Sequence, residues 1–296
     1  MFHAKHDSGG GLKGVWRGSK RGLTRATAHY ARASRVLAMA MLAACFSPEA
    51  MASQTAIVPP PAPPPPPAPA PGVTTFTDKA AKGEAIRDFA YEWPAAVSAV
   101  PALVERFTAE RDRILADQKQ EWDSALAEFS AEDCGGCVNR SFEKTWQVVA
   151  NLPRFLSLSA TFWEYSGGAH GNGAFDALVW DRTAKQAIDP KAMFRSPQAL
   201  QNALGAGWCK ALKTEKKARL GPDYYDDGFF PCPPVSDLTV MVGSSNRRAF
   251  NRISLIAAPY VAGAYAEGTY EATLPVTRAV LAAVKPEYRA AFAPGK

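Results

Sequence analysis

A proline tract divides this chain into parts that cannot share one core. Residues 59–71 hold ten prolines and three alanines. Proline fixes φ and lacks a backbone N–H, so such a segment favours polyproline II over a helix or a sheet. At about 3.1 Å per residue it spans roughly 40 Å. We therefore expect a Pro-rich stalk over residues 53–75 and a folded body after it, although the same composition is typical of a disordered linker.

The residues ahead of the stalk have the composition of an export leader. An apolar run at residues 36–44 follows scattered basic residues. It is too short to span a bilayer but suits the core of a signal peptide. Two processing sites compete, because the run ending in Cys45 resembles a lipobox and Ala50-Met51-Ala52 suits ordinary signal peptidase. We expect a leader over residues 1–52 and a periplasmic protein, which is anchored as a lipoprotein if Cys45 is lipidated. A third interpretation of the apolar run is that it stays uncleaved and serves as a membrane anchor.

The positive charge of the chain belongs to this leader. The chain has a formal net charge of +6, but residues 1–45 hold eight Lys or Arg and one Asp. The remainder therefore carries 26 positive and 27 negative side chains. A near-neutral body lacks the electrostatic footprint of a nucleic-acid binder, so we expect no nucleic-acid partner.

The body mixes strand and helix patterns. Alternation predicts a strand at residues 87–93, and an apolar stripe predicts a long helix that Ser98 caps and that runs to about Phe129. Further strands are predicted at residues 145–150, 155–164, 174–180, 238–242, 253–257 and 269–274, and helices at 196–221 and 277–284. This order predicts an α+β fold of antiparallel sheets with packed helices. We expect an N-terminal strand–helix module at residues 76–150 and a larger module at 151–296.

The body contains four cysteines, namely Cys134, Cys137, Cys209 and Cys232. An even number in an exported chain indicates two disulfides, and we expect Cys134–Cys137 and Cys209–Cys232. The C-x-x-C could instead be a redox motif, but Glu132 and Asp133 precede it and would raise the thiol pKa. A zinc site of all four cysteines is a further alternative with weak spacing.

The stretch at residues 157–172, SLSATFWEYSGGAHGN, predicts a strand that enters a glycine-dense turn. His170 in this turn is the only histidine beyond the leader. It either ties the turn to a neighbouring segment or contacts a ligand. One histidine cannot supply a catalytic zinc site with two or three histidine ligands, and the nucleophile elbow and the phosphate-binding loops are absent. These absences favour a protein without catalytic residues, metal or cofactor.

Several segments together resemble a bacterial envelope family. They are Leu156-Ser157-Leu158, the turn from Tyr165 to His170, Asp189-Pro190 with Phe194, and residues 260–268. They look like the extracytoplasmic domain of RsiV-type anti-sigma factors and the accessory domain of PdaC-type peptidoglycan deacetylases. The strand at 87–93 and its helix resemble the companion N-terminal module of that family.

The resemblance implies a domain that binds something at the cell envelope, which in the anti-sigma relatives is lysozyme. The deacetylase activity of such proteins belongs to a separate metal-dependent domain, and nothing here matches it. The anti-sigma role needs a cytoplasmic sigma-binding segment and a membrane span, and we expect the leader to supply neither.

We expect the ligand site where the glycine turn and the tyrosine-rich segment meet. The candidate residues are Tyr165, His170, Asn172, Tyr260, Tyr265 and Glu267. Aromatic rings stack on sugars or anchor protein interfaces, although these tyrosines could also be partly core.

The expected function is that of an exported, non-catalytic envelope domain. Its expected partner is a cell-wall glycan or an envelope protein, such as the wall-attacking lysozyme, besides a membrane if Cys45 carries a lipid. The alternative is a cell-wall glycan hydrolase or deacetylase that uses His170 or a carboxylate pair such as Asp226–Asp227 in a cleft. A purely structural envelope protein is the third hypothesis.

Overall fold

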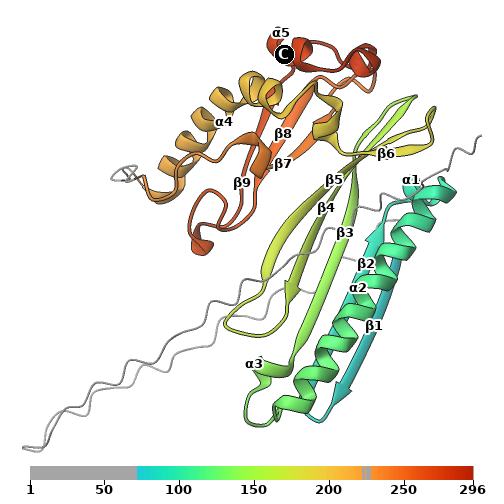
Figure 1. Cartoon of the computed structure of the whole chain (residues 1–296), viewed down its shortest axis with the longest axis vertical. Coiled ribbons are helices and arrows are strands. Elements are labelled where there is room, and N and C mark those ends of the chain that lie inside the picture. Colours follow the sequence, from blue (N-terminus) through green and yellow to red (C-terminus); the bar gives the residue numbers. More distant parts are fainter. Residues whose placement is uncertain (1–71, 222–223, 225–227, 296) are drawn as a thin grey trace, which may run out of the picture. The chain divides into compact units, whose positions relative to one another are not determined.

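A computed structural model describes residues 72–221, 224 and 228–295. The expected leader with Cys45, most of the expected stalk, and the Asp226–Asp227 pair lie outside the described residues. Within the described residues the chain forms two sheets and their helices (Figure 1). The predicted α+β fold is confirmed. No helix in this part of the chain is long and apolar enough to cross a membrane.

The first sheet has six strands in sequence order. They are β1 (Thr74–Lys82), β2 (Ala85–Trp93), β3 (Arg140–Asn151), β4 (Phe155–Tyr165), β5 (Asn172–Asp181) and β6 (Gln186–Ile188). Neighbours pair antiparallel except β2 and β3, which pair parallel. A parallel pair needs a long crossover, and the helix between these two strands supplies it. Strand β3 continues to Asn151, with a register shift against β4 between Val148 and Ala150, next to the expected module boundary.

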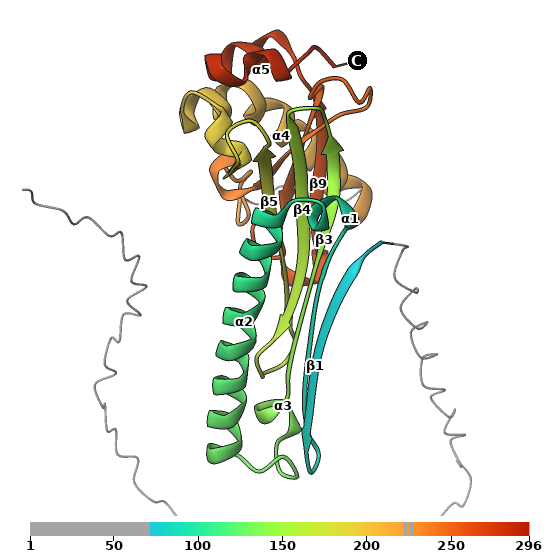
Figure 2. The same ribbon diagram turned by 90° about the vertical axis from the view of Figure 1, so that its right-hand side faces the viewer.

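Helix α2 (Pro101–Glu128) lies along one face of this sheet (Figure 2). Its apolar stripe buries Leu103, Phe107 and Leu115, and the Phe107 ring stacks on Trp146 with centroids 4.4 Å apart. The prediction that Ser98 caps this helix is wrong, because Ser98 ends a separate short helix, α1 (Ala95–Ser98). The Ser98 hydroxyl instead accepts a hydrogen bond from the Trp93 indole at 3.1 Å.

A second sheet packs on the opposite face of the first. It contains β7 (Thr239–Gly243), β8 (Arg252–Ala257) and β9 (Tyr270–Pro275), all antiparallel. Successive residues of a strand point to opposite faces, so Leu178 joins the core under α2 while Val179 joins the core shared with the second sheet. The Thr239 hydroxyl donates to the Phe175 carbonyl at 3.1 Å, which links β7 to β5.

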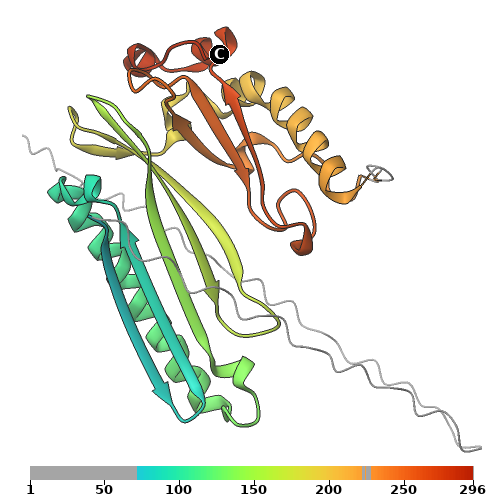
Figure 3. The same ribbon diagram turned by 180° about the vertical axis from the view of Figure 1, so that it is seen from behind.

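Helix α4 (Pro197–Leu220) packs beside the second sheet (Figure 3). It begins and ends as predicted, since Ser196 accepts a hydrogen bond from the Ala199 N–H and Gly221 ends the helix at a φ of 100°. The remaining short elements are α3 (Gly135–Val138), α5 (Arg278–Ala283), and the 3-10 helices η1 (Pro190–Met193), η2 (Val235–Asp237), η3 (Tyr265–Glu267) and η4 (Pro286–Ala291).

Both predicted disulfides are confirmed. Cys134 pairs with Cys137 at α3, and Cys209 on α4 pairs with Cys232 in the segment before β7. This pairing overturns the alternative of a four-cysteine zinc site. Among the described residues no group of three or more His, Cys, Asp or Glu side chains is placed to hold a metal ion.

An ion pair between the buried Asp181 and the partly exposed Arg154, at the end of β5, makes stability depend on acid pH. The Asp181 side chain is 1% exposed and accepts hydrogen bonds from the Arg154 guanidinium and the Thr183 N–H. The Arg154 hydrogen bonds hold the pKa of the Asp181 carboxyl below its ordinary value. A carboxyl with a lowered folded-state pKa stabilises above its unfolded-state pKa, and this stability is lost as the pH falls through the folded-state pKa.

We therefore expect Asp181→Asn to be less stable at pH 7 and to lose less further stability than wild type between about pH 5 and about pH 2. Urea unfolding across this pH range measures both effects. Asp123→Asn is the control, because Asp123 is exposed on α2. Equal pH slopes for wild type and Asp181→Asn would contradict the role of this ion pair.

Candidate functional site

The glycine turn between β4 and β5 meets the tyrosine-rich segment between β8 and β9. The His170 imidazole stacks on the Tyr265 ring, with centroids 3.8 Å apart and planes 18° apart. Tyr260 Oη lies 3.2 Å from His170 Nε2, and Tyr265 Oη donates to the Gly171 carbonyl at 2.7 Å. Three of the six predicted residues therefore come together, from segments about 90 positions apart in sequence.

Trp163 on β4 adjoins these residues and was missing from the predicted site. A Cβ on Gly171 would lie 2.3 Å from the Trp163 indole, so the turn backbone rests on this ring and only glycine fits. Trp163 is 41% exposed and Tyr260 is 53% exposed. We call Trp163, His170, Tyr260 and Tyr265 the aromatic cluster.

The backbone of the aromatic cluster is strained at Tyr260. This residue has a φ of 71°, a conformation that bulky side chains rarely adopt. Strain of this kind persists only where the surrounding structure imposes it, and it gathers at binding and active sites. Here it coincides with a ring that is 53% exposed.

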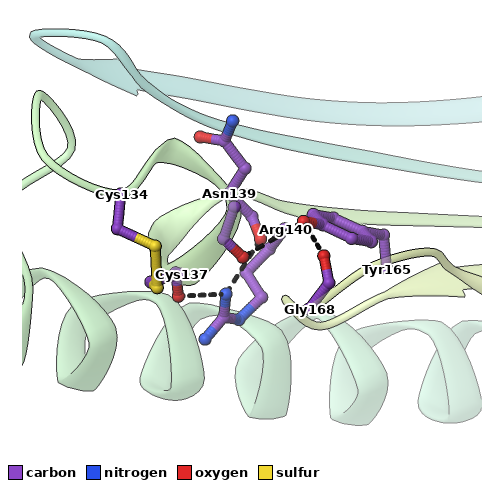
Figure 4. The surroundings of a disulfide bond; sticks show 7 residues. Cys134, Cys137, Asn139, Arg140, Tyr165 and Gly168 are labelled. Carbon is purple, nitrogen blue, oxygen red and sulfur yellow. Dashed lines mark hydrogen bonds between the residues drawn. A yellow bond between two sulfur atoms is a disulfide. The ribbon is translucent and has the colours of Figure 1, made fainter. Parts of the chain in front are cut away.

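Tyr165 reaches the C-x-x-C loop (Figure 4), and its ring also stacks on Trp163 of the aromatic cluster, with centroids 6.3 Å apart. Its Oη lies 3.1 Å from the Gly136 carbonyl oxygen and 2.9 Å from that of Gly168. The Gly168 N–H also donates to the Gly136 carbonyl, at 3.1 Å. Arg140 donates to the Cys137 carbonyl at 3.0 Å from the same side. Tyr165 and the disulfide loop therefore hold the base of the glycine turn in place.

The other two predicted residues, Glu267 and Asn172, stay outside the aromatic cluster. Glu267 accepts hydrogen bonds from the Ala264 N–H at 2.7 Å and from the Tyr270 hydroxyl at 2.6 Å, which closes the turn at η3. Burial and the Glu267 carboxylate raise the pKa of the Tyr270 hydroxyl. Asn172 is exposed at the start of β5, and its side chain makes no hydrogen bond to another described residue.

His170 is engaged through both ring nitrogens. Nδ1 lies 3.0 Å from the Gly171 carbonyl oxygen and Nε2 lies 3.2 Å from Tyr260 Oη. A general base must offer a nitrogen to the proton that it removes. In this arrangement the imidazole links the glycine turn to the Tyr260 hydroxyl.

A polar groove between α2 and strands β3–β5 is a second candidate site. It contains three adjoining cavities of about 650, 320 and 570 Å³. The first and second share Asp117 in their walls, and the second and third share Glu110 and Asp176. Lys144 is 3% exposed in this wall and donates to the carboxylates of Glu110 and Asp176.

Glu164 lines the middle cavity of this groove together with Glu121. Burial raises the pKa of the Glu164 carboxyl, and the charge of Glu121 raises it further. Sequence reasoning missed the groove, although a signal existed. Lys144 occupies a strand position between the core residues Phe142 and Trp146, where an apolar side chain is expected.

Comparison with known proteins identifies part of the chain. Residues 81–173 match the family model described as Deacetylase PdaC, from the end of β1 through α2 and the glycine turn to the start of β5. The chain therefore carries a PdaC-like domain, and the expected resemblance is confirmed over these residues. No curated protein matches the sequence.

Two solved structures are similar to the chain. One is a DUF3298 family protein from Pseudomonas aeruginosa PAO1, with 17% identity, a TM-score of 0.44, and coverage of 77% of this chain and 99% of that one. The other is a DUF3298 family member from Bacteroides fragilis NCTC 9343, with 14% identity, a TM-score of 0.43, and coverage of 69% and 89%.

Proposed function

We propose that this chain, which carries a PdaC-like domain, is a non-catalytic binding protein of the bacterial cell envelope whose ligand is a cell-wall glycan. The aromatic cluster carries this proposal. Trp163 and Tyr260 leave much of their ring surface open to solvent at 41% and 53% exposure. Flat rings of this kind stack on the apolar faces of sugars, and the Tyr260 hydroxyl adds a polar group that orients them.

The rigidity of the aromatic cluster supports the same proposal. The Tyr265 ring is fixed between the His170 stack and the hydrogen bond to Gly171, and Gly171 lies on Trp163. Side chains that are already ordered lose little conformational entropy when a ligand binds. The site is thus formed before its ligand arrives.

We expect His170→Ala and Tyr265→Ala each to weaken the binding of soluble muropeptides about tenfold or more, because each removes a ring that holds its neighbours. Tyr265→Phe keeps the stack and loses only the bond to Gly171, so its loss should be smaller. Isothermal titration calorimetry measures these affinities. Phe129→Ala is the control, because Phe129 is 41% exposed and lines the groove but lies outside the aromatic cluster.

Muropeptide affinity that falls in Phe129→Ala and not in Tyr265→Ala would contradict the aromatic cluster as the site. A parallel titration with lysozyme tests the protein ligand that the family resemblance implies. Saturable lysozyme binding without glycan binding would replace the glycan by a wall-attacking protein as the ligand.

The groove favours one other function, that of a glycan hydrolase or deacetylase. Glu164, with its raised pKa, and Glu121 line the same cavity. A carboxyl with a raised pKa that faces a second carboxyl across a cavity is the arrangement that acid–base hydrolysis uses. Muropeptides incubated with the protein should stay unchanged if it only binds. New reducing ends or released acetate that Glu164→Gln abolishes would instead make it an enzyme.

A further inference from the structure

A cavity that is partly open to solvent lies where the segment before α4 meets the segment after α5. Its volume is about 330 Å³, and it shares no lining residue with the groove or the aromatic cluster. A β-bridge between Phe194 and Val284 joins the two segments. The Lys285 N–H donates to the Met193 carbonyl at 3.0 Å and the Arg195 N–H donates to the Ala283 carbonyl at 2.9 Å. The backbone that frames this cavity is therefore fixed.

Three cationic side chains line this cavity, Lys191, Arg195 and Lys285, and no carboxylate does. None of them forms a salt bridge with another residue of the described chain. Lys191 donates to the Ser236 carbonyl at 2.6 Å, while the Arg195 guanidinium lies 3.4 Å from the Val284 carbonyl oxygen. Like charges around one cavity repel each other, and a bound anion would remove that repulsion.

The rest of the lining points to an anion on a small organic body. Ala192, Phe194, Pro197 and Leu200 give the cavity an apolar wall, with Ser196 and Ser236 beside the cations. Lysine and arginine are the residues that bind phosphate most often, as a point charge and as a two-pronged donor. We propose that this cavity binds the phosphate group of a phosphate ester, with the ester's organic part against the apolar wall. The site is independent of the proposed glycan binding.

Calorimetry on the full chain tests this proposal with three probes: inorganic phosphate, glycerol 3-phosphate, and phosphatidylglycerol vesicles compared with phosphatidylcholine vesicles. We expect saturable binding of glycerol 3-phosphate that Lys285→Gln weakens about tenfold, because one of three cations is lost. Lys285 is the best position to change, since its side chain makes no hydrogen bond or ion pair with another described residue. Lys213→Gln, an exposed lysine farther along α4, should bind like wild type.

Comparing the soluble phosphate ester with the lipid vesicles shows where the phosphate group comes from. Binding to phosphatidylglycerol vesicles that Lys285→Gln reduces would assign a lipid headgroup, and binding of glycerol 3-phosphate alone would assign a soluble ester. No saturable binding of any probe would overturn the proposal. So would inorganic phosphate binding as tightly as the ester, or an equal loss in Lys285→Gln and Lys213→Gln.

Discussion

Replacing Glu110 by Gln and Asp176 by Asn together should lower the free energy of unfolding by about 3–5 kcal/mol. Lys144 is 3% exposed, and its ammonium donates to both carboxylates, which joins α2 and β5 to β3. Without them a buried cation has no compensating charge, so it must lose its proton or draw water into the core. Urea unfolding followed by tryptophan fluorescence measures the loss.

The matched variant is Lys144→Met, which removes the cation and keeps most of its volume. The side chains of Glu110 and Asp176 are 23% and 47% exposed, so both carboxylates keep contact with water when Lys144 is gone. We expect a loss of only about 1–2 kcal/mol. A larger loss in Lys144→Met than in the double variant would contradict the view that the buried cation is the group that needs its partners.

Replacing Cys209 and Cys232 by serine should lower the free energy of unfolding by about 3 kcal/mol. This disulfide closes a loop of sequence separation 23, so it removes many conformations from the unfolded chain. It also fastens α4 to the segment that leads into β7. Chemical unfolding of the oxidised proteins measures the effect.

The second disulfide provides the comparison, because its sequence separation is only 3. Serine at Cys134 and Cys137 should lower the free energy of unfolding by about 2 kcal/mol. Wild type unfolded in excess reductant should be less stable than either pair variant. A smaller loss for the Cys209–Cys232 pair than for the Cys134–Cys137 pair would contradict the loop-length explanation.

Most elements could be predicted because apolar spacing reports burial directly. The stripe of α2 and the signals at Ser196 and Gly221 needed no tertiary information. Strand β1 gave no such signal, since it is mostly exposed at the edge of the sheet and has no apolar alternation. The prediction of antiparallel sheets missed the parallel pairing of β2 with β3, because a long helix between two strands permits either direction.

The candidate site was predictable only in part, for a different reason. His170, Tyr260 and Tyr265 were paired through the family resemblance, since no periodicity reports a contact across about 90 residues. Trp163 lies out of phase with the apolar alternation of its strand. Its solvent exposure identifies it as a candidate binding residue, and that exposure is known only from the structure. Glu267 carries a charge that suited a ligand site, but its partners are Ala264 and Tyr270.

The main proposal for this chain is that the aromatic cluster binds a cell-wall glycan. NMR of the tryptophan indole N–H signals during a titration with soluble muropeptides is the most direct test of this proposal. We predict that the Trp163 signal, assigned with Trp163→Phe, shifts saturably, while the fully buried Trp208 stays in place. The Trp146 signal should also stay in place, because Trp146 lines the groove. A titration that shifts Trp146 and leaves Trp163 unchanged, or that shifts neither, would contradict glycan binding at the aromatic cluster.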